Sequence, residues 1–118
     1  MIKLTDGPAA GSYAVKRAPL YLRAVVLDSE KDVLDRIEDT PHELEAVYVY
    51  KRDGEAGTVH LNFGGGKSRA RTGFYATGVY RHLPDVDGKT VRESTAWRAW
   101  VEAQVGSPID PETGVAQA

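Results

Sequence analysis

The sequence predicts an α+β fold, in which one twisted, mostly antiparallel sheet of about five strands has two helices packed on one face. Three observations support this prediction. Several short segments alternate between apolar and polar residues, two segments have helical spacing, and no strand–helix–strand unit recurs along the 118 residues. The chain therefore predicts hairpins covered by helices rather than a parallel sheet.

The strands are predicted from alternation and from residues that favour β-structure. These features occur at residues 12–17, 20–27, 46–52, 58–63 and 74–82. In the second segment Leu22, Ala24 and Val26 share one face and Arg23 lies on the other, which predicts a half-buried strand. A turn that begins at Asp53 joins the third and fourth segments as a hairpin.

The two predicted helices each begin at a capping residue. Ser29 opens a helix over residues 29–39, which carries a narrow apolar stripe and ends before Pro41. Thr90 opens a second helix that runs to Val105. The apolar face of this second helix, which is predicted to cover the sheet, consists of Trp97, Trp100, Val101 and Val105.

The chain length predicts a single domain over residues 1–105, followed by a polar, flexible tail over residues 106–118. There is no cysteine, which excludes disulfides and thiolate nucleophiles. No segment has the length and apolar character of a signal peptide or a membrane span. We therefore expect a cytoplasmic protein that does not interact with membranes.

Charge is segregated along the chain although the net charge is only −2. Residues 28–45 hold eight acidic residues against two basic ones. Residues 56–84 hold no acidic residue and four basic ones, which form the predicted binding residues: Lys67, Arg69, Arg71 and Arg81. An acidic segment and a basic loop on one chain suit contact with another protein or with a second copy.

The basic residues follow three glycines in the stretch "HLNFGGGKSRARTGFY", residues 60–75. The motif of a phosphate-binding loop is not met, because Leu61 occupies the position of its first glycine and a strand is predicted in place of a helix. Two alternatives remain, which are a flexible hairpin loop and a basic loop that contacts phosphates or an acidic protein. Tyr75 and Tyr80 either stack on bases or pack in the sheet.

No catalytic, metal or cofactor site is predicted. His42, His60 and His82 lack the spacing of zinc ligands, although His60 and His82 lie on neighbouring predicted strands. The run Asp85-Val86-Asp87-Gly88 fails the frame of a calcium loop and predicts a turn. Trp97 and Trp100 are predicted in the core, and an exposed one would be an anchor for a partner.

Four stretches carry a resemblance to a group of phage proteins. They are "LTDGPAAGSYAVKRAPLYLRAVV", "KDVLDRIEDTP", "AVYVYKR" and "GFYATGVYRHLPDVDG". Over residues 3–100 the chain resembles uncharacterised small proteins of actinobacterial phages and prophages, although Asp6 stands where many of those have a glycine. The matching stretches are turns and strands without catalytic residues. The resemblance implies a small accessory protein that acts inside a bacterial host cell.

The sequence thus favours a non-enzymatic protein that binds a host protein, associates with itself, or does both. A first alternative is a nucleic-acid-binding protein that uses the basic loop at residues 64–71. A second alternative is a small nuclease or nucleotide hydrolase that uses His60 or His82 together with an acid.

Overall fold

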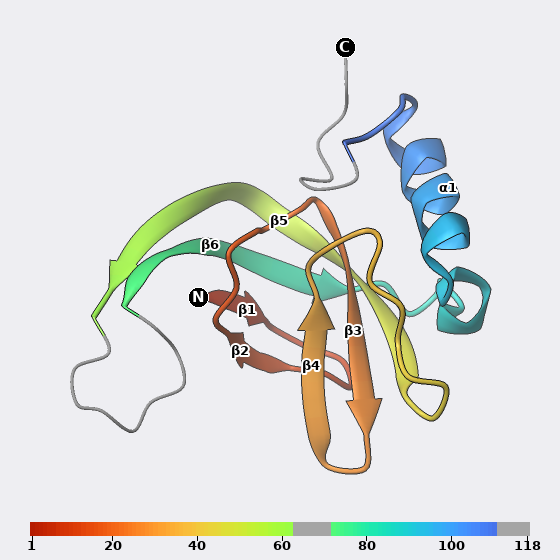
Figure 1. Cartoon of the computed structure of the whole chain (residues 1–118), viewed down its shortest axis with the longest axis horizontal. Coiled ribbons are helices and arrows are strands. Elements are labelled where there is room, and N and C mark those ends of the chain that lie inside the picture. The colour runs from red at the N-terminus through yellow and green to blue at the C-terminus, as the bar shows by residue number, and fades with distance from the viewer. Residues whose placement is uncertain (63–71, 111–118) are drawn as a thin grey trace.

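The computed structural model describes residues 1–62 and 72–110. Within these residues, six strands form one sheet, followed by a 3₁₀-helix, η1 (Gly88–Val91), and an α-helix, α1 (Ser94–Val105), as shown in Figure 1. The strands are β1 (Ile2–Leu4), β2 (Gly11–Tyr13), β3 (Tyr21–Leu27), β4 (Glu30–Leu34), β5 (Ala46–Leu61) and β6 (Gly73–His82).

The sheet curves until it is nearly closed like a barrel. Its strand order is β2-β1-β6-β5-β3-β4, and neighbouring strands are antiparallel except β1 and β6, which are parallel. The two edge strands face each other across the barrel, because Tyr13 of β2 and Val33 of β4 pack in the same apolar cluster. A barrel of this shape leaves little edge exposed for unwanted pairing.

Two apolar clusters hold the fold together, and β3 contributes to both. Alternate residues of a strand point to opposite faces of its sheet. Leu22 and Ala24 therefore face the barrel interior, whereas Tyr21 faces α1. The interior cluster comprises Ile2, Leu4, Ala9, Leu22, Ala24, Val33, Tyr50 and Tyr80. The outer cluster, between the sheet and α1, comprises Tyr21, Ile37, Val49, Val91, Trp97, Val101 and Ile109.

The predicted fold class is wrong, because the structure has a nearly closed six-stranded sheet and, within the described residues, a single α-helix. The error begins at Ser29. The expected helix over residues 29–39 is the strand β4, which pairs with β3 through Leu27 opposite Glu30. A two-residue turn joins them, with Asp28 in the left-handed region at φ 56°. The turn overrides the weak helical stripe because β4 adds Val33 to the interior cluster.

The predicted turn after Asp53 is also wrong, because β5 continues through it to Leu61. Asp53 pairs with Val79 and Gly57 pairs with Thr77, so β5 has two more residues than β6 between these pairs. A β-bulge absorbs extra residues in one strand without ending it. The glycines that indicated a turn in the sequence therefore belong to a bend within a long strand.

The predicted helix with two tryptophans is confirmed, although it begins later than expected. α1 starts at Ser94, and η1 precedes it with the Asp87 side chain accepting a hydrogen bond from Lys89 N at 2.9 Å. Gly106 ends α1 in the left-handed conformation, at φ 75°. All four residues of the predicted apolar face pack in or against the outer cluster.

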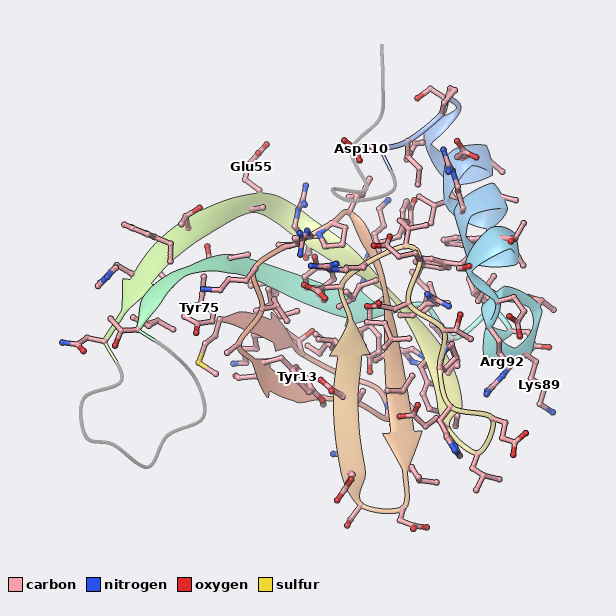
Figure 2. All side chains as sticks on the ribbon, in the orientation of Figure 1. Tyr13, Glu55, Tyr75, Lys89, Arg92 and Asp110 are labelled. Atoms are coloured by element: carbon pink, nitrogen blue, oxygen red, sulfur yellow. The ribbon has the colours of Figure 1, made fainter. Side chains whose placement is uncertain are left out.

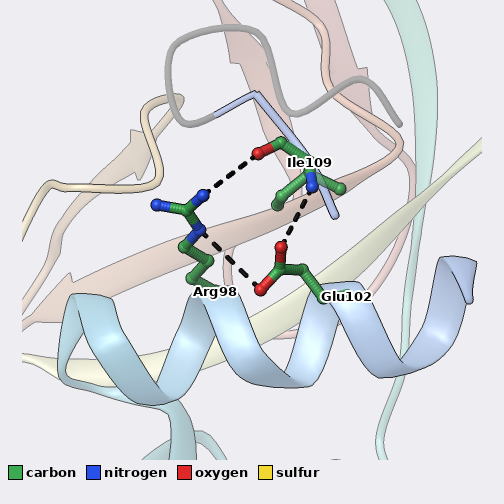
Figure 3. A network of polar contacts seen from close by, with 3 residues as sticks. All are labelled: Arg98, Glu102 and Ile109. Atoms are coloured by element: carbon green, nitrogen blue, oxygen red, sulfur yellow. Dashed lines mark hydrogen bonds and ion pairs between the residues drawn. The ribbon is translucent and has the colours of Figure 1, made fainter. Parts of the chain in front are cut away.

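The chain remains packed after α1 ends. Glu102 Oε2 accepts a hydrogen bond from Ile109 N at 3.0 Å, and Arg98 Nη2 donates to Ile109 O at 3.4 Å (Figure 3). Ile109, which lies in the predicted tail, is fully buried in the outer cluster. Residues 111–118 lie outside the described part of the chain. In the described part, no helix is both long enough and apolar enough to cross a membrane.

Candidate functional site

The far ends of β5 and β6 form a two-stranded arm that extends beyond the barrel on the side away from α1 (Figure 1). We define the hairpin arm as residues 57–61 of β5 paired with residues 73–77 of β6. It begins at the β-bulge between Asp53 and Gly57, which bends β5 away from the barrel. Figure 2 shows Glu55 pointing outward from this bend.

The bend is built from two glycines and one arginine. Gly54 has φ +86°, a conformation that favours glycine. Arg52 Nε donates to Gly54 O at 3.0 Å, and its Nη1 donates to Ala18 O, so one side chain ties the bulge to the segment before β3. Gly57 has no room for a side chain, because an added Cβ would lie 2.7 Å from Oγ1 of Thr77.

The segment after β2 supports the arm along its β6 edge. Ala76 N donates to Val15 O at 2.9 Å, and Lys16 Nζ donates to Phe74 O at 2.9 Å. The same ammonium group lies 3.7 Å from the centre of the Tyr75 ring, and Tyr75 is only 6% exposed. The face of the arm that carries Tyr75 is therefore fixed by contacts within the chain.

The opposite face of the arm presents an aromatic pair to solvent. The Phe74 side chain is 66% exposed, and its ring meets the ring of its cross-strand partner His60 edge-on at 4.9 Å. Aromatic side chains are enriched at protein–protein interfaces, so this exposed pair is a candidate contact surface. The sequence pattern does not distinguish Phe74 from other strand residues, because alternation alone does not show that the sheet narrows to two strands here.

Of the four predicted binding residues, the structure describes only Arg81. Lys67, Arg69 and Arg71 lie outside the described residues. Arg81 is exposed on β6, eight residues from Gly73, which corresponds to about 26 Å along a strand. Its cross-strand partner is Lys51, so Arg81 belongs to the outer face of the barrel rather than to the arm.

The histidines do not form a shared site. His60 is on the arm, whereas His82 ends β6 between the rings of Tyr48 and Tyr50, with ring centres at 5.9 and 5.2 Å. The strand positions of Phe74, which pairs with His60, and of His82 are about 26 Å apart. Across residues 1–62 and 72–110, no three histidine, aspartate or glutamate side chains are grouped to hold a metal ion.

The tyrosines of the barrel are structural. Tyr80 is fully buried and donates its hydroxyl to Pro19 O, so it packs in the sheet and is not placed to stack on a base. Tyr50 donates to Asp6 O at 2.8 Å and accepts from Ala9 N at 3.0 Å, while Tyr13 donates to Ala9 O at 2.7 Å. Burial raises the pKa of all three hydroxyls above the ordinary tyrosine value.

A groove of about 530 Å³ lies between the β4–β5 loop and η1, with Lys89 and Arg92 beside it (Figure 2). Arg92 Nη2 donates to His42 O at 2.8 Å, and its Nη1 donates to Glu45 O. This guanidinium therefore holds the loop in place. The basic and acidic residues of the groove are mixed, so its charge indicates no class of ligand.

Comparisons with protein-family models, with curated proteins and with solved structures found no match to this chain.

Proposed function

We propose that this chain is a non-enzymatic accessory protein that acts in the bacterial cytoplasm by binding a second protein through the hairpin arm. The partner is a host protein or another copy of the chain. One observation carries this proposal, which is the exposed pair of Phe74 and His60 on an arm that projects beyond the barrel. A partner that covered the Phe74 ring would remove apolar surface from water, which favours binding.

The way in which the arm is held also favours a contact surface. Lys16 and Val15 bind one edge of it and Arg52 ties its bend to the barrel, so the exposed pair is presented on a supported element. A surface that is rigid before binding loses less conformational entropy when it binds. The charge segregation along the sequence adds a means of orienting a partner.

The proposal is tested with Phe74→Asp and a matched control, Leu44→Asp. Leu44 is 69% exposed and lies outside the arm, so it controls for a charge placed on an exposed apolar residue. Light scattering on the purified proteins measures the mass in solution. Affinity capture from nuclease-treated bacterial lysate, followed by cross-linking from a photoreactive residue at position 60, identifies contacts made by the arm.

The outcomes distinguish self-association through the arm, a host partner at the arm, and an arm that is not a contact surface. Mass above that of a monomer that Phe74→Asp abolishes and Leu44→Asp preserves shows self-association through the arm. A monomer that cross-links one host protein, again dependent on Phe74 only, shows a host partner. If neither the mass nor the cross-linked proteins respond to Phe74→Asp more than to Leu44→Asp, the arm is not the contact surface. Charge reversal of Lys67, Arg69 and Arg71 tests the sequence-based prediction for the basic loop in the same assays.

A further inference from the structure

A pocket beside α1, away from the arm, combines aromatic rings with a basic group. Its volume is about 260 Å³, and Tyr21 and Trp100 form part of its wall. The Tyr21 ring meets the Trp100 ring edge-on at 5.0 Å. Trp100 is also stacked at 5.3 Å on Trp97, which is buried in the outer cluster. The core therefore fixes the orientation of the Trp100 ring, which is half-buried at the pocket.

One cation lines this pocket, and a second lies beside it on the neighbouring strand. Lys51 lines it, with Nζ 5.7 Å from the centre of the Tyr21 ring, and Arg81 lies directly opposite Lys51 on β6. The ion pairs formed among the described residues involve neither of them. Like charges opposite each other on paired strands destabilise a sheet. A bound anion would offset this repulsion.

The pocket also carries hydrogen-bonding groups of a different kind. Asp85 and Gln104 line it, and both are exposed. A carboxylate accepts hydrogen bonds and an amide both donates and accepts them, which matches the edges of nucleobases. Because the Asp85 carboxylate repels an anion, an anionic group is favoured near the cations of Lys51 and Arg81.

We propose that this pocket binds a nucleotide unit, with the base against Trp100 and Tyr21 and the phosphate at Lys51 and Arg81. The volume lies just below the range of about 300 to 1,000 Å³ that is usual for ligand pockets, which suits a base with its sugar and phosphate outside. Stacking on aromatic rings and phosphate contact by cations are shared by free nucleotides and single strands. This inference is independent of the hairpin arm.

The test is a titration followed by NMR on protein labelled with ¹⁵N. The protein has two tryptophans, so the indole signals of Trp97 and Trp100 report separately on the core and on the pocket. The probes are the four common ribonucleoside monophosphates and short homopolymeric single strands. Saturable shifts of the Trp100 indole and of the amides of residues 83–86, larger than those of Trp97, are expected.

The variants are Lys51→Met, Arg81→Met and the double variant, with Lys89→Met as the control. Lys89 is an exposed lysine on η1 and does not line this pocket. Each single variant should weaken binding by about tenfold, because a charge-assisted contact is lost, while the control should bind as the wild type does. Circular dichroism confirms that the variants are folded.

Two results would overturn the inference. The first is the absence of a saturable Trp100 shift with every probe. The second is an equal loss of affinity in Lys89→Met and in the variants of Lys51 and Arg81, which would indicate unspecific attraction. If binding occurs, a single strand that binds much more tightly than its monophosphate identifies nucleic acid as the ligand, and equal affinities identify a free nucleotide.

Discussion

Arg23 connects the sheet to the segments that pack on its outer face. It lies on β3 and is fully buried, with its guanidinium 5.3 Å from the centre of the Trp97 ring. Burial lowers its pKa to about 10, while the nearby carboxylates of Asp39 and Glu93 act in the opposite direction. The guanidinium donates to four main-chain carbonyls, those of Ile37, Asp39, Val91 and Arg92.

Replacing Arg23 with methionine should destabilise the fold by about 3 kcal/mol or more, because buried carbonyls lose a charged donor and stay unpaired. Urea unfolding measures this loss. Arg36→Met is the control, since Arg36 is exposed and forms only a surface ion pair with Glu38 at 3.8 Å. A loss for Arg23→Met no larger than that of the control would mean that the carbonyls are satisfied in another way.

The sequence predicted which face of β3 carries Arg23 but not that this face is buried. Alternation in one strand shows only that its two faces differ. Burial of Arg23 depends on α1, which is more than sixty residues away in the chain. The exposure of Phe74 has a similar origin, because it depends on where β1 stops pairing with β6. Local sequence patterns show neither the position of α1 over β3 nor the point at which β1 stops pairing with β6.

The packing of η1 against β5 depends on Gly88, because this residue has no side chain. An added Cβ would lie 1.8 Å from Val47 O, so η1 rests directly on the main chain of β5. Gly88→Ala should destabilise the fold by about 3 kcal/mol, and thermal or urea unfolding measures the change. Gly78→Ala is the matched control, because its nearest contact would be an ordinary one at 3.4 Å. Equal stability of the two variants would show that η1 can move away from β5.

The segment after α1 packs against α1 and is held to it by hydrogen bonds. Ile109 is fully buried, and Glu102 and Arg98 hold its main chain (Figure 3). Ile109→Ala should therefore cost about 2 to 5 kcal/mol of unfolding free energy, whereas Pro108→Ala, at an exposed neighbour, should cost little. If both changes are small in urea unfolding, the contacts of Ile109 with α1 do not stabilise the fold.

At the scale of elements, the sequence predicted a helix correctly where the apolar residues were large and regularly spaced. The second predicted helix had large apolar residues at regular spacing, and α1 confirms it. The segment at residues 29–39 carried a cap signal and a stripe of only three apolar residues, and it formed β4 because a tight turn placed it beside β3. Propensity decides such a segment only when no neighbouring strand competes for it.

At the scale of the whole molecule, closure of the sheet was beyond prediction from the sequence. It requires β1 to pair with β6 in parallel, although paired residues such as Ile2 and Gly78 are 76 positions apart in the chain. Alternation predicts strands but not their partners. The same pairing brings the tyrosines Tyr13, Tyr50 and Tyr80 into one interior cluster. The response of the barrel to pH follows from this arrangement.

The barrel should lose stability as the pH rises above 10. The folded state raises the pKa of Tyr13, Tyr50 and Tyr80 above the unfolded value of 10.0, mainly through burial. Their contribution is therefore complete below pH 10 and is lost as the pH rises through the folded pKa values. Each tyrosine reduces the unfolding free energy by up to about 1.4 kcal/mol per pH unit in that range.

The effect of Arg23 on stability has the opposite sign, because burial lowers its pKa from the ordinary arginine value to about 10. The contribution of Arg23 to the free energy of unfolding therefore rises with pH in the same range. Three tyrosines lower this free energy and one arginine raises it, so the free energy of unfolding should fall as the pH rises. Urea unfolding from neutral pH to beyond pH 10 measures the slope, and tyrosinate absorbance follows the summed ionisation of the six tyrosines. Tyr80→Phe removes one titrating group and should make the slope shallower. A free energy that stays level, with all tyrosines ionised before unfolding, would mean that water reaches the hydroxyls inside the barrel.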